Sequence, residues 1–541
     1  MKRIQRILLY IFIIILLFLP AVWSLFHPGF FPSDDGEWMV VRLSDFHRSF
    51  VSGQIPVRWA ARLNYEYGYP VFNFLYPLSL YFGEFFHLLG FGFVNSIKII
   101  FILSFFLSAI FMFLFTREFW GDLGGLISAV FYAYAPYRFL DVYVRGSIGE
   151  AVSFIFVPLI FWMIYKLSQR KKWLYVVIGA FGYAGLIMSH NIMAMIFSLV
   201  LVFYIGFCWI SSNKKFSLLT SYFLLLILGL GLSCFFWLPA FYDKQFTILD
   251  KVTVAQFWEH FPTLSQLIIP SWGYGPSIPG PNDFASYQIG IAHILVVVLM
   301  VVALWKLQAL FFLSIFVIFF FLMLSFSTPI WKIVPMLWRV QFPWRLLAIT
   351  TFTSAVLSGA VVQLAKPKFK IALTGLVIVL VVLVNYRYAK PEYFVNRGEE
   401  FYSTNEATTT VKDEYMPIWA EEKPTERAKQ KVEIISGEGL INELFFNSKK
   451  ASFDIEAKTN SEIQVNTVYF PGWQAKVDGQ RIPLLYDNKQ GLMRLKIMPG
   501  KHHVLVEFGE TPVRLLSDII SLGSLLVVGG IFIRKYKNEK Q

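Results

Sequence analysis

Carboxylates follow directly after the first hydrophobic segment of this 541-residue chain, where they could do chemistry at a membrane surface. The stretch from Phe31 to Trp38 carries Asp34, Asp35 and Glu37, and it opens a long polar loop instead of a tight turn. Carboxylates at the mouth of a helical bundle stay charged at little cost, because water reaches them there. Such groups can take a proton from a hydroxyl or hold a divalent cation.

Further charged side chains belong to loops that the sequence places on the same membrane face as Asp34 and Asp35. They are Asp141, Arg145 and Glu150 in one loop, His190 with Asn191 in the next, and Arg339, Trp344 and Arg345 in a third. Arginines can hold a phosphate through paired hydrogen bonds. The shared sidedness of these groups predicts a site for transfer from a phosphate-linked lipid.

Each of these groups also has a purely structural interpretation. Asp34 and Asp35 could cap the helix that starts near Glu37, Asp141 and Arg145 could form a surface ion pair, His190 could cap a helix end, and Arg339 and Arg345 could reach toward the membrane interface. Their common location favours a site over these separate roles.

More than half of the residues, 56%, are hydrophobic and only 15% are charged, a composition that indicates a membrane protein. The net charge of +13 comes with Lys and Arg gathered in short loops between apolar segments. This positive-inside pattern accounts for the basic balance and argues against nucleic-acid binding. Cys208 and Cys234 lie in apolar segments and predict neither a metal site nor a disulfide. The first apolar segment has no small-residue cleavage site after it, so we expect it to stay as a helix.

About 20 consecutive apolar residues cross a bilayer, and about twelve segments of this chain qualify. The predicted spans are residues 7–26, 96–116, 122–138, 150–168, 173–189, 192–210, 216–241, 286–305, 309–326, 344–365, 370–388 and 513–533. The basic loops 166–172 and 366–370 and the tail 534–540 are assigned to the cytoplasm. We therefore predict a multi-pass membrane protein with both termini in the cytoplasm.

The segment 72–93 is also apolar enough to span, but it carries Pro77, Glu84 and His87. A span here would place the basic loop 166–172 outside. We therefore expect an amphipathic helix lying on the outer surface, within a first outer loop that runs from residue 27 to 95. A groove between this helix and the bundle would receive a lipid tail.

Residues 389–512 are polar and rich in turns, unlike the rest of the chain. Alternating runs at 451–457, 463–468 and 503–508 predict antiparallel strands, and Val477–Gln480 predicts a hairpin turn. We expect a small β-sandwich outside the membrane. The chain then consists of a transmembrane domain (1–388), this β-rich domain (389–512) and a final helix with a basic tail (513–541).

Several motifs resemble a known family. They are Asp35-Gly36, Gly53–Trp59 (GQIPVRW), Gly68–Leu78 (GYPVFNFLYPL), Leu186–Asn191 (LIMSHN), Phe342–Arg345 (FPWR), Asp413–Trp419 (DEYMPIW), and Phe470–Trp473 (FPGW) with Val477–Gly479. On these residues the chain resembles the bacterial membrane proteins known as 6-pyruvoyl-tetrahydropterin synthase-related, and more distantly the YfhO-type proteins. Its overall arrangement is similar to the GT-C superfamily of polytopic glycosyltransferases, and nearly the whole chain takes part in the resemblance.

The resemblance implies a GT-C-like helical bundle that moves a sugar from a polyprenyl-phosphate-linked donor to a glycan, lipid or protein acceptor outside the membrane. In such enzymes the first-loop acid is a general base or a metal ligand, which maps onto Asp35, with Asp34 as its competitor. The second-loop acid maps onto Asp141 or Glu150. A divalent cation, Mg²⁺ or Mn²⁺, would lie between Asp35 and Asp141.

The substrate-binding side of this prediction is cationic and aromatic. Its members are Arg145, His190, Arg339, Trp344 and Arg345. Two other functions remain open from the sequence. A lipid or polysaccharide transporter predicts a continuous polar path through the bundle, and a non-catalytic envelope scaffold predicts acids dispersed over the surface.

Overall fold

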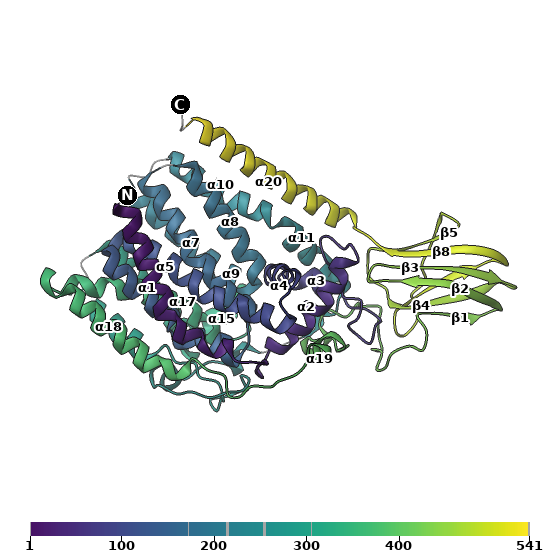
Figure 1. Ribbon diagram of the computed structural model, residues 1–541, viewed down its shortest axis with the longest axis horizontal. Helices are drawn as coiled ribbons and strands as arrows, with labels where there is room; N and C mark the ends of the chain where they lie inside the picture. Colours follow the sequence, from purple (N-terminus) through teal and green to yellow (C-terminus); the bar gives the residue numbers. More distant parts are fainter. Residues whose placement is uncertain (1, 171, 213–215, 253–255, 304–305, 539–541) are drawn as a thin grey trace.

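The computed structural model describes residues 2–170, 172–212, 216–252, 256–303 and 306–538. Its helices form a bundle, and its strands form a separate domain at one end of that bundle (Figure 1). Both chain termini lie at the opposite end from the strands (Figure 1). The side of the membrane that this end faces stays a prediction. Lys171 and Lys540, which belong to two of the predicted basic segments, lie outside the described residues.

Seven helices of the described residues are long and apolar enough to cross a membrane, and two bent helix pairs raise that number to nine. Two shorter apolar helices and a reversal within α5 account for the rest of the predicted spans. The spans are α1 (Lys2–Val22), the two arms of α5 (Phe93–Ala133), α7 (Ile148–Gln169), α8 (Trp173–Ser189), α9 (Asn191–Ser211), α10 with α11 (Phe216–Leu232 and Cys234–Asp243), α13 (Ile291–Val302), α14 (Leu307–Leu322), α17 (Leu347–Ser358), α18 (Lys370–Asn385) and α20 (Pro512–Asn538). The prediction of a polytopic helical membrane protein is confirmed.

The chain folds back on itself within α5, at Gly121. This residue has φ 76° and ψ 178°, which no helix accommodates. A Cβ built on Gly125 would lie 2.9 Å from the Phe113 ring, whereas residues twelve apart in a straight helix are separated by about 18 Å. The two predicted spans 96–116 and 122–138 are therefore a tight helical hairpin.

The predicted surface helix 72–93 is wrong in its extent. The structure divides this segment into α3 (Val71–Phe74) and α4 (Leu78–Leu88), and α5 already begins at Phe93. Pro77 is the physical reason, because a proline disfavours helical backbone at the residue before it. The interruption brings Tyr76 to the turn between α3 and α4, where it faces the pocket described below.

The remaining helices lie in the loops at the ends of the spans. They are α2 (Gly36–Val51), α6 (Pro136–Phe139), the π-helical turn η2 (Leu140–Val144), α12 (Leu264–Ile268), α15 (Thr328–Ile333), α16 (Pro335–Trp338) and α19 (Glu399–Ser403). Most of them surround the pocket end of the bundle.

The strands form two antiparallel sheets that enclose a small core. One sheet has the order β1 (Val432–Ser436), β4 (Ser461–Val468), β7 (Leu492–Ile497), and the other has β2 (Gly439–Phe446), β3 (Lys450–Ala457), β8 (Gly500–Phe508), β5 (Trp473–Val477), β6 (Gln480–Ile482). The predicted strands and the hairpin at Val477–Gln480 are confirmed. Asp478 and Gly479 both have positive φ, as a two-residue hairpin turn requires.

A polar network joins α20 to the first loop and to α11. Arg58 donates to Glu510 and Asp518, each at 2.9 Å. Arg514, itself fully buried, donates to Asp243 at 2.8 Å. Because each buried charge has a partner of opposite sign, this network fixes the position of the last helix against the loop that follows α1.

The β domain is fastened to the first loop by Trp59. Its side chain is 1% exposed, lies 5.7 Å from Trp473 and 6.3 Å from Phe470, and covers Gly68, whose added Cβ would lie 2.2 Å from the indole. One aromatic side chain of the first loop thus completes the core of the sandwich.

Removing this side chain should loosen the sandwich from the loop. We expect Trp59→Ala to lower the free energy of unfolding by about 3–5 kcal/mol, because a buried indole leaves a cavity. Thermal unfolding of the purified protein measures the loss. Trp258→Ala, at a side chain that is 55% exposed, is the control; equal unfolding temperatures for the two variants would contradict the assignment.

Candidate functional site

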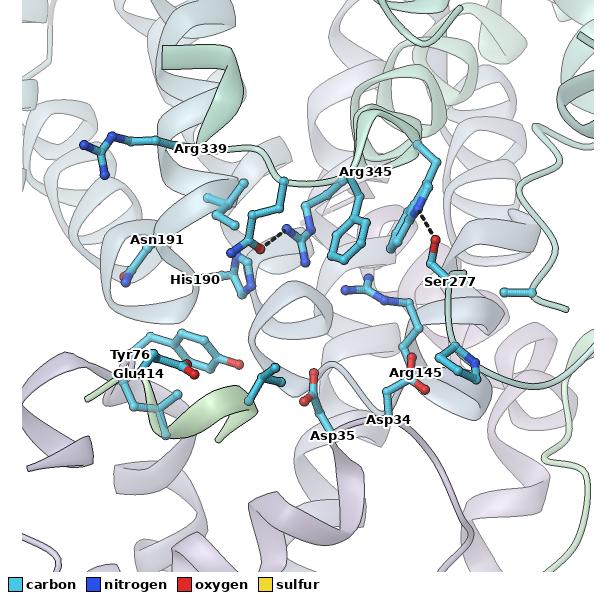
Figure 2. Close-up of a pocket in the computed structure, with 18 of the residues that line it drawn as sticks. Asp34, Asp35, Tyr76, Arg145, His190, Asn191, Ser277, Arg339, Arg345 and Glu414 are labelled. Atoms are coloured by element: carbon cyan, nitrogen blue, oxygen red, sulfur yellow. Dashed lines mark hydrogen bonds between the residues drawn. The ribbon is translucent and has the colours of Figure 1, made fainter. Parts of the chain in front are cut away.

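One pocket, at the end of the bundle nearest the first loop, collects charged side chains from segments far apart in the sequence. Its volume is about 690 Å³. It is lined by the start of α2, the turn between α3 and α4, the start of α9, the loops 275–287 and 339–345, and the segment 411–415 (Figure 2). Of the predicted site residues, Asp34, Asp35, Arg145, His190, Arg339, Trp344 and Arg345 all line it. The convergence that the sequence predicts is therefore present.

The two aspartates are held in place by backbone contacts with the second loop. The Asp35 N–H donates to the Arg145 carbonyl at 2.8 Å, and the Asp34 N–H donates to the Val144 carbonyl at 3.3 Å. Asp35 occupies the N-cap position of α2, but its side chain makes no capping hydrogen bond. Its carboxylate points into the pocket instead (Figure 2). The alternative that Asp35 serves only as a helix cap is not what the structure shows.

Gly146 makes this close approach possible. It has φ +62°, and a Cβ on it would lie 2.5 Å from both the Gly36 nitrogen and the Ser33 hydroxyl. Only glycine adopts this backbone conformation cheaply and leaves room for the neighbouring loop. The first and second loops consequently meet backbone to backbone.

The opposite wall of the pocket is cationic and rests on a buried carboxylate. Glu150 is fully buried, and its Oε1 accepts from Arg145 Nη2 and from Arg345 Nε, both at 2.9 Å. Its Oε2 accepts from the Tyr137 hydroxyl at 2.8 Å. Arg145 also donates to Asp141, which is buried too, at 2.5 Å.

Asp141 and Glu150 were predicted as catalytic acids, and the structure places them behind the arginines instead. Their side chains do not line the pocket, and Arg145 bonds to both of them. A buried arginine needs a buried anion beside it, so these carboxylates fix the arginines in position. Asp141 and Arg145 are a buried pair, not the exposed surface pair that the sequence left open.

Aromatic rings complete the cationic wall. Arg145 lies over the Trp344 ring at 4.8 Å, and Trp344 stacks on Tyr287 at 4.9 Å and donates to Ser277 at 3.2 Å. Arg345 donates to Gln341 at 3.0 Å (Figure 2). Arg339 is exposed at the rim of the pocket and points away from its centre (Figure 2).

His190 lies between α8 and α9 and faces Tyr76 and Glu150. Its Nδ1 accepts from the Met193 N–H at 3.2 Å, so its proton is on Nε2, which is 3.9 Å from Glu150 Oε1. Burial lowers the pKa of His190 to about 3, against the opposing charge of Glu150. His190 is therefore neutral at neutral pH, and it both caps α9 and lines the pocket.

Glu414 also lines the pocket, and the sequence analysis did not single it out as a site residue. It comes from the segment between α18 and the first strand, which the neighbouring Tyr415 anchors by stacking on Phe74 at 5.0 Å. Its Oε2 is buried without a hydrogen-bond partner among the described residues. The motif Asp413–Trp419 contains it, but nothing in the local pattern shows that this segment reaches the bundle.

The pocket changes the acidity of two carboxyls. Partial desolvation by the surrounding protein raises the pKa of Asp34 to about 6, and the charge of the neighbouring Asp35 adds to the rise. The side chain of Asp34 is nevertheless exposed to solvent. Burial raises the pKa of Glu414 to about 7, with Arg42 opposing the shift. Both groups titrate near neutral pH, which suits a proton acceptor.

The predicted cation between Asp35 and Asp141 does not fit this geometry. Asp141 is buried and bonded to Arg145, so the two carboxylates do not face one space. Across the described ranges, no cluster of three or more His, Cys, Asp or Glu side chains is arranged to hold a metal ion. A requirement for Mg²⁺ or Mn²⁺ stays a prediction.

Residues 72–391 match the model of the family described as "6-pyruvoyl-tetrahydropterin synthase related domain; membrane protein". The chain belongs to this family. The match confirms the resemblance drawn from the motifs, and the protein is a multi-pass membrane protein. Glu414 lies beyond the matched residues, as does the whole β domain.

Individual relatives are distant. The chain is 24% identical over 238 residues to an uncharacterised protein of Lactococcus lactis subsp. cremoris, which is 42% of this chain and 39% of that protein. The chain thus matches less than half the length of this relative.

Two solved structures share a distant likeness. One is ArnT from Cupriavidus metallidurans bound to undecaprenyl phosphate, with a TM-score of 0.37, 12% identity, and coverage of 70% of this chain and 64% of that one. The other is the oligosaccharyltransferase of Archaeoglobus fulgidus in the apo form, with a TM-score of 0.39, 14% identity, and coverage of 75% and 57%. At these scores and identities the two likenesses assign no superfamily, residue role or activity to this chain.

The contact at Gly146 can be tested directly. We expect Gly146→Ala to destabilise the protein by about 1–3 kcal/mol, because the new methyl group forces the first loop away and strains the backbone. Thermal unfolding measures the change. Gly398→Ala is the matched control, since nothing lies within 4 Å of its added Cβ. Equal stability of the two variants would show that the loops do not meet as described.

Proposed function

We propose that the protein is a membrane glycosyltransferase that moves a sugar from a polyprenyl-phosphate donor to an acceptor on the membrane face that carries the β domain. One observation supports this proposal above the others. A single pocket opposes carboxylates from the first loop to arginines held by buried anions. Such a pocket suits a reaction in which one side accepts a proton and the other stabilises a growing phosphate charge.

The proposed step uses both walls. The Asp35 carboxylate takes the proton of the acceptor hydroxyl, and the acceptor oxygen forms a bond to the anomeric carbon of the donor sugar. The bond between that carbon and the phosphate oxygen breaks, and its electron pair stays on the phosphate. Arg145 and Arg345 offer N–H donors to this phosphate, while Arg339 stands at the rim.

Glu414 gives the pocket a further carboxylate that faces the same space as Asp35. The charge of Asp35 contributes to the raised pKa of Glu414, so the two groups are close enough to interact. Asp35 and Glu414 are therefore two candidate proton acceptors, and experiment must distinguish them. Asp34, the competitor named from the sequence, is the third group to test.

The proposed orientation of the protein in the membrane follows from the same arrangement. The basic loops and both termini would be cytoplasmic, and the pocket and β domain would face the cell exterior. The acceptor would be a glycan, a lipid or a protein. Adding EDTA, and then Mg²⁺ or Mn²⁺, to the transfer assay tests the remaining cation prediction.

Replacing Asp35 should abolish transfer without unfolding the protein. We expect Asp35→Asn to lower the transfer rate by about 100-fold or more, because the amide accepts no proton. Purified protein is assayed with a panel of polyprenyl-phosphate sugars. Asp487→Asn, at an exposed carboxylate of the β domain, should keep wild-type activity. Unchanged transfer by Asp35→Asn would remove this residue from the mechanism, and the same test on Asp34 and Glu414 would identify its replacement.

If Asp34 or Glu414 accepts the proton in place of Asp35, transfer should depend on pH between about 6 and 7, the pKa values of Asp34 and Glu414. A raised pKa keeps a carboxyl protonated at lower pH, so kcat/KM should rise as the pH increases through this range. Glu414→Gln should move the rising limb toward about 6, where Asp34 titrates. A wild-type profile that falls with increasing pH over this range would contradict a carboxylate proton acceptor.

A further inference from the structure

A second large cavity lies at the membrane-facing surface, between α9 and α14. Its volume is about 650 Å³, similar to that of the charged pocket, and its lining is almost entirely apolar. Ile315 and Phe319 of α14 form a buried floor, whereas Val202 and Ile318 stand exposed at its edges. The ring of Phe207 packs 4.8 Å from Phe311, and both side chains line the groove.

The groove lies in line with the charged pocket along one face of α9. Ile192 and Met195 line the pocket, and Leu199, Phe203 and Gly206 line the groove. These positions are three or four residues apart, so they form a single stripe on the helix. A chain that extends from the pocket past Met195 along this face of α9 would therefore lie toward the groove.

The wall of the groove formed by α14 also leads toward the charged pocket. α14 ends at Leu322, which lines the groove, and the chain then continues into the loop that carries Arg339 and Arg345. Arg339 lies on the same side of the pocket as Asn191, the first residue of α9 (Figure 2). Both walls of the groove thus start at the cationic end of the pocket.

The depth of the groove decides what kind of chain fits it. At 1.5 Å per residue, Leu199 lies about 10 Å and Ile210 about 27 Å below Ile192. One leaflet of the bilayer core is about 15 Å deep, half of its total thickness. An ordinary acyl chain anchored at the pocket would end at the midplane, but the groove continues past it.

We propose that the groove between α9 and α14 binds the hydrocarbon tail of a long-chain polyprenyl phosphate whose phosphate lies in the charged pocket. This inference rests on the proposed function, because it extends the donor site. It replaces the groove along the segment 72–93 that the sequence predicted for the tail. Since the tail already lies in hydrocarbon, the groove would hold it by van der Waals packing and not by transfer from water.

Gly206 provides a clean way to fill the groove. A Cβ on Gly206 meets nothing within 4 Å, so a large side chain there projects into the open space without displacing the protein. Gly206→Trp is the variant that fills the groove, and Gly375→Trp in α18 is its matched control, since Gly375 is also helical and free of neighbours within 4 Å. Gly206→Leu is a smaller version of the same change in case Gly206→Trp gives little folded protein.

The test uses a long-chain polyprenyl phosphate with a diazirine at the end of its tail, added to the purified protein in lipid nanodiscs. We expect photolabelling of α9 and α14 residues in the wild type and in Gly375→Trp, and a loss of about tenfold in Gly206→Trp. Equal labelling of Gly206→Trp and the wild type would overturn the assignment. So would equal labelling by a diacyl phospholipid with the same diazirine, because the groove would then hold ordinary bilayer lipid.

A transfer assay separates this inference from the proposed function. If transfer occurs, Gly206→Trp should raise the KM of the long-chain donor by about tenfold and leave that of a short-chain prenyl donor unchanged. A rise for both donors would overturn the tail assignment. If the wild type transfers no sugar but the labelling follows the expected pattern, the proposed reaction fails and the lipid site stands.

Discussion

The pocket depends on one buried carboxylate that two arginines share. Glu150 lies out of reach of water, and its charge is balanced by Arg145 and Arg345, which lie 200 residues apart in the sequence. Burying an unpaired charge costs several kcal/mol, so these side chains must be buried together. The bundle, the second loop and the loop before α17 are consequently locked in one arrangement, and the arginines present a fixed cationic surface.

This constraint explains why the acidic side of the pocket is built from elsewhere. The carboxylates nearest to the arginines form ion pairs with them and do not face the pocket. The free carboxylates come from two segments that dock onto this assembly from outside: the first loop, through the backbone contact at Gly146, and the segment before the β domain, through Tyr415. The β domain therefore bears on the site, because its connecting segment supplies Glu414 and Trp59 fastens the domain to the first loop.

Much of the fold could be predicted from local sequence. The spans follow from apolar length, and the strands follow from alternation, because both patterns report burial at short range. The interruption at Pro77 and the reversal at Gly121 mark the limits of that approach, since a hydropathy pattern shows where an apolar segment is but not how its backbone turns. For the site, the shared membrane face of Asp34, Asp35, Arg145 and Arg345 was enough to predict that they meet.

The sequence by itself determined a polytopic membrane protein, its β domain and the family to which it belongs, because composition, periodicity and motifs are properties of neighbouring residues. Only the tertiary structure decided which charged side chains are paired inside the protein and which face the pocket. Asp141 and Asp35 are the same residue type in similar loops, yet one is buried against an arginine and the other faces the pocket. Glu414 joins the site and the apolar groove forms between α9 and α14 for the same reason: contacts between segments distant in sequence fix both, and no local pattern encodes them.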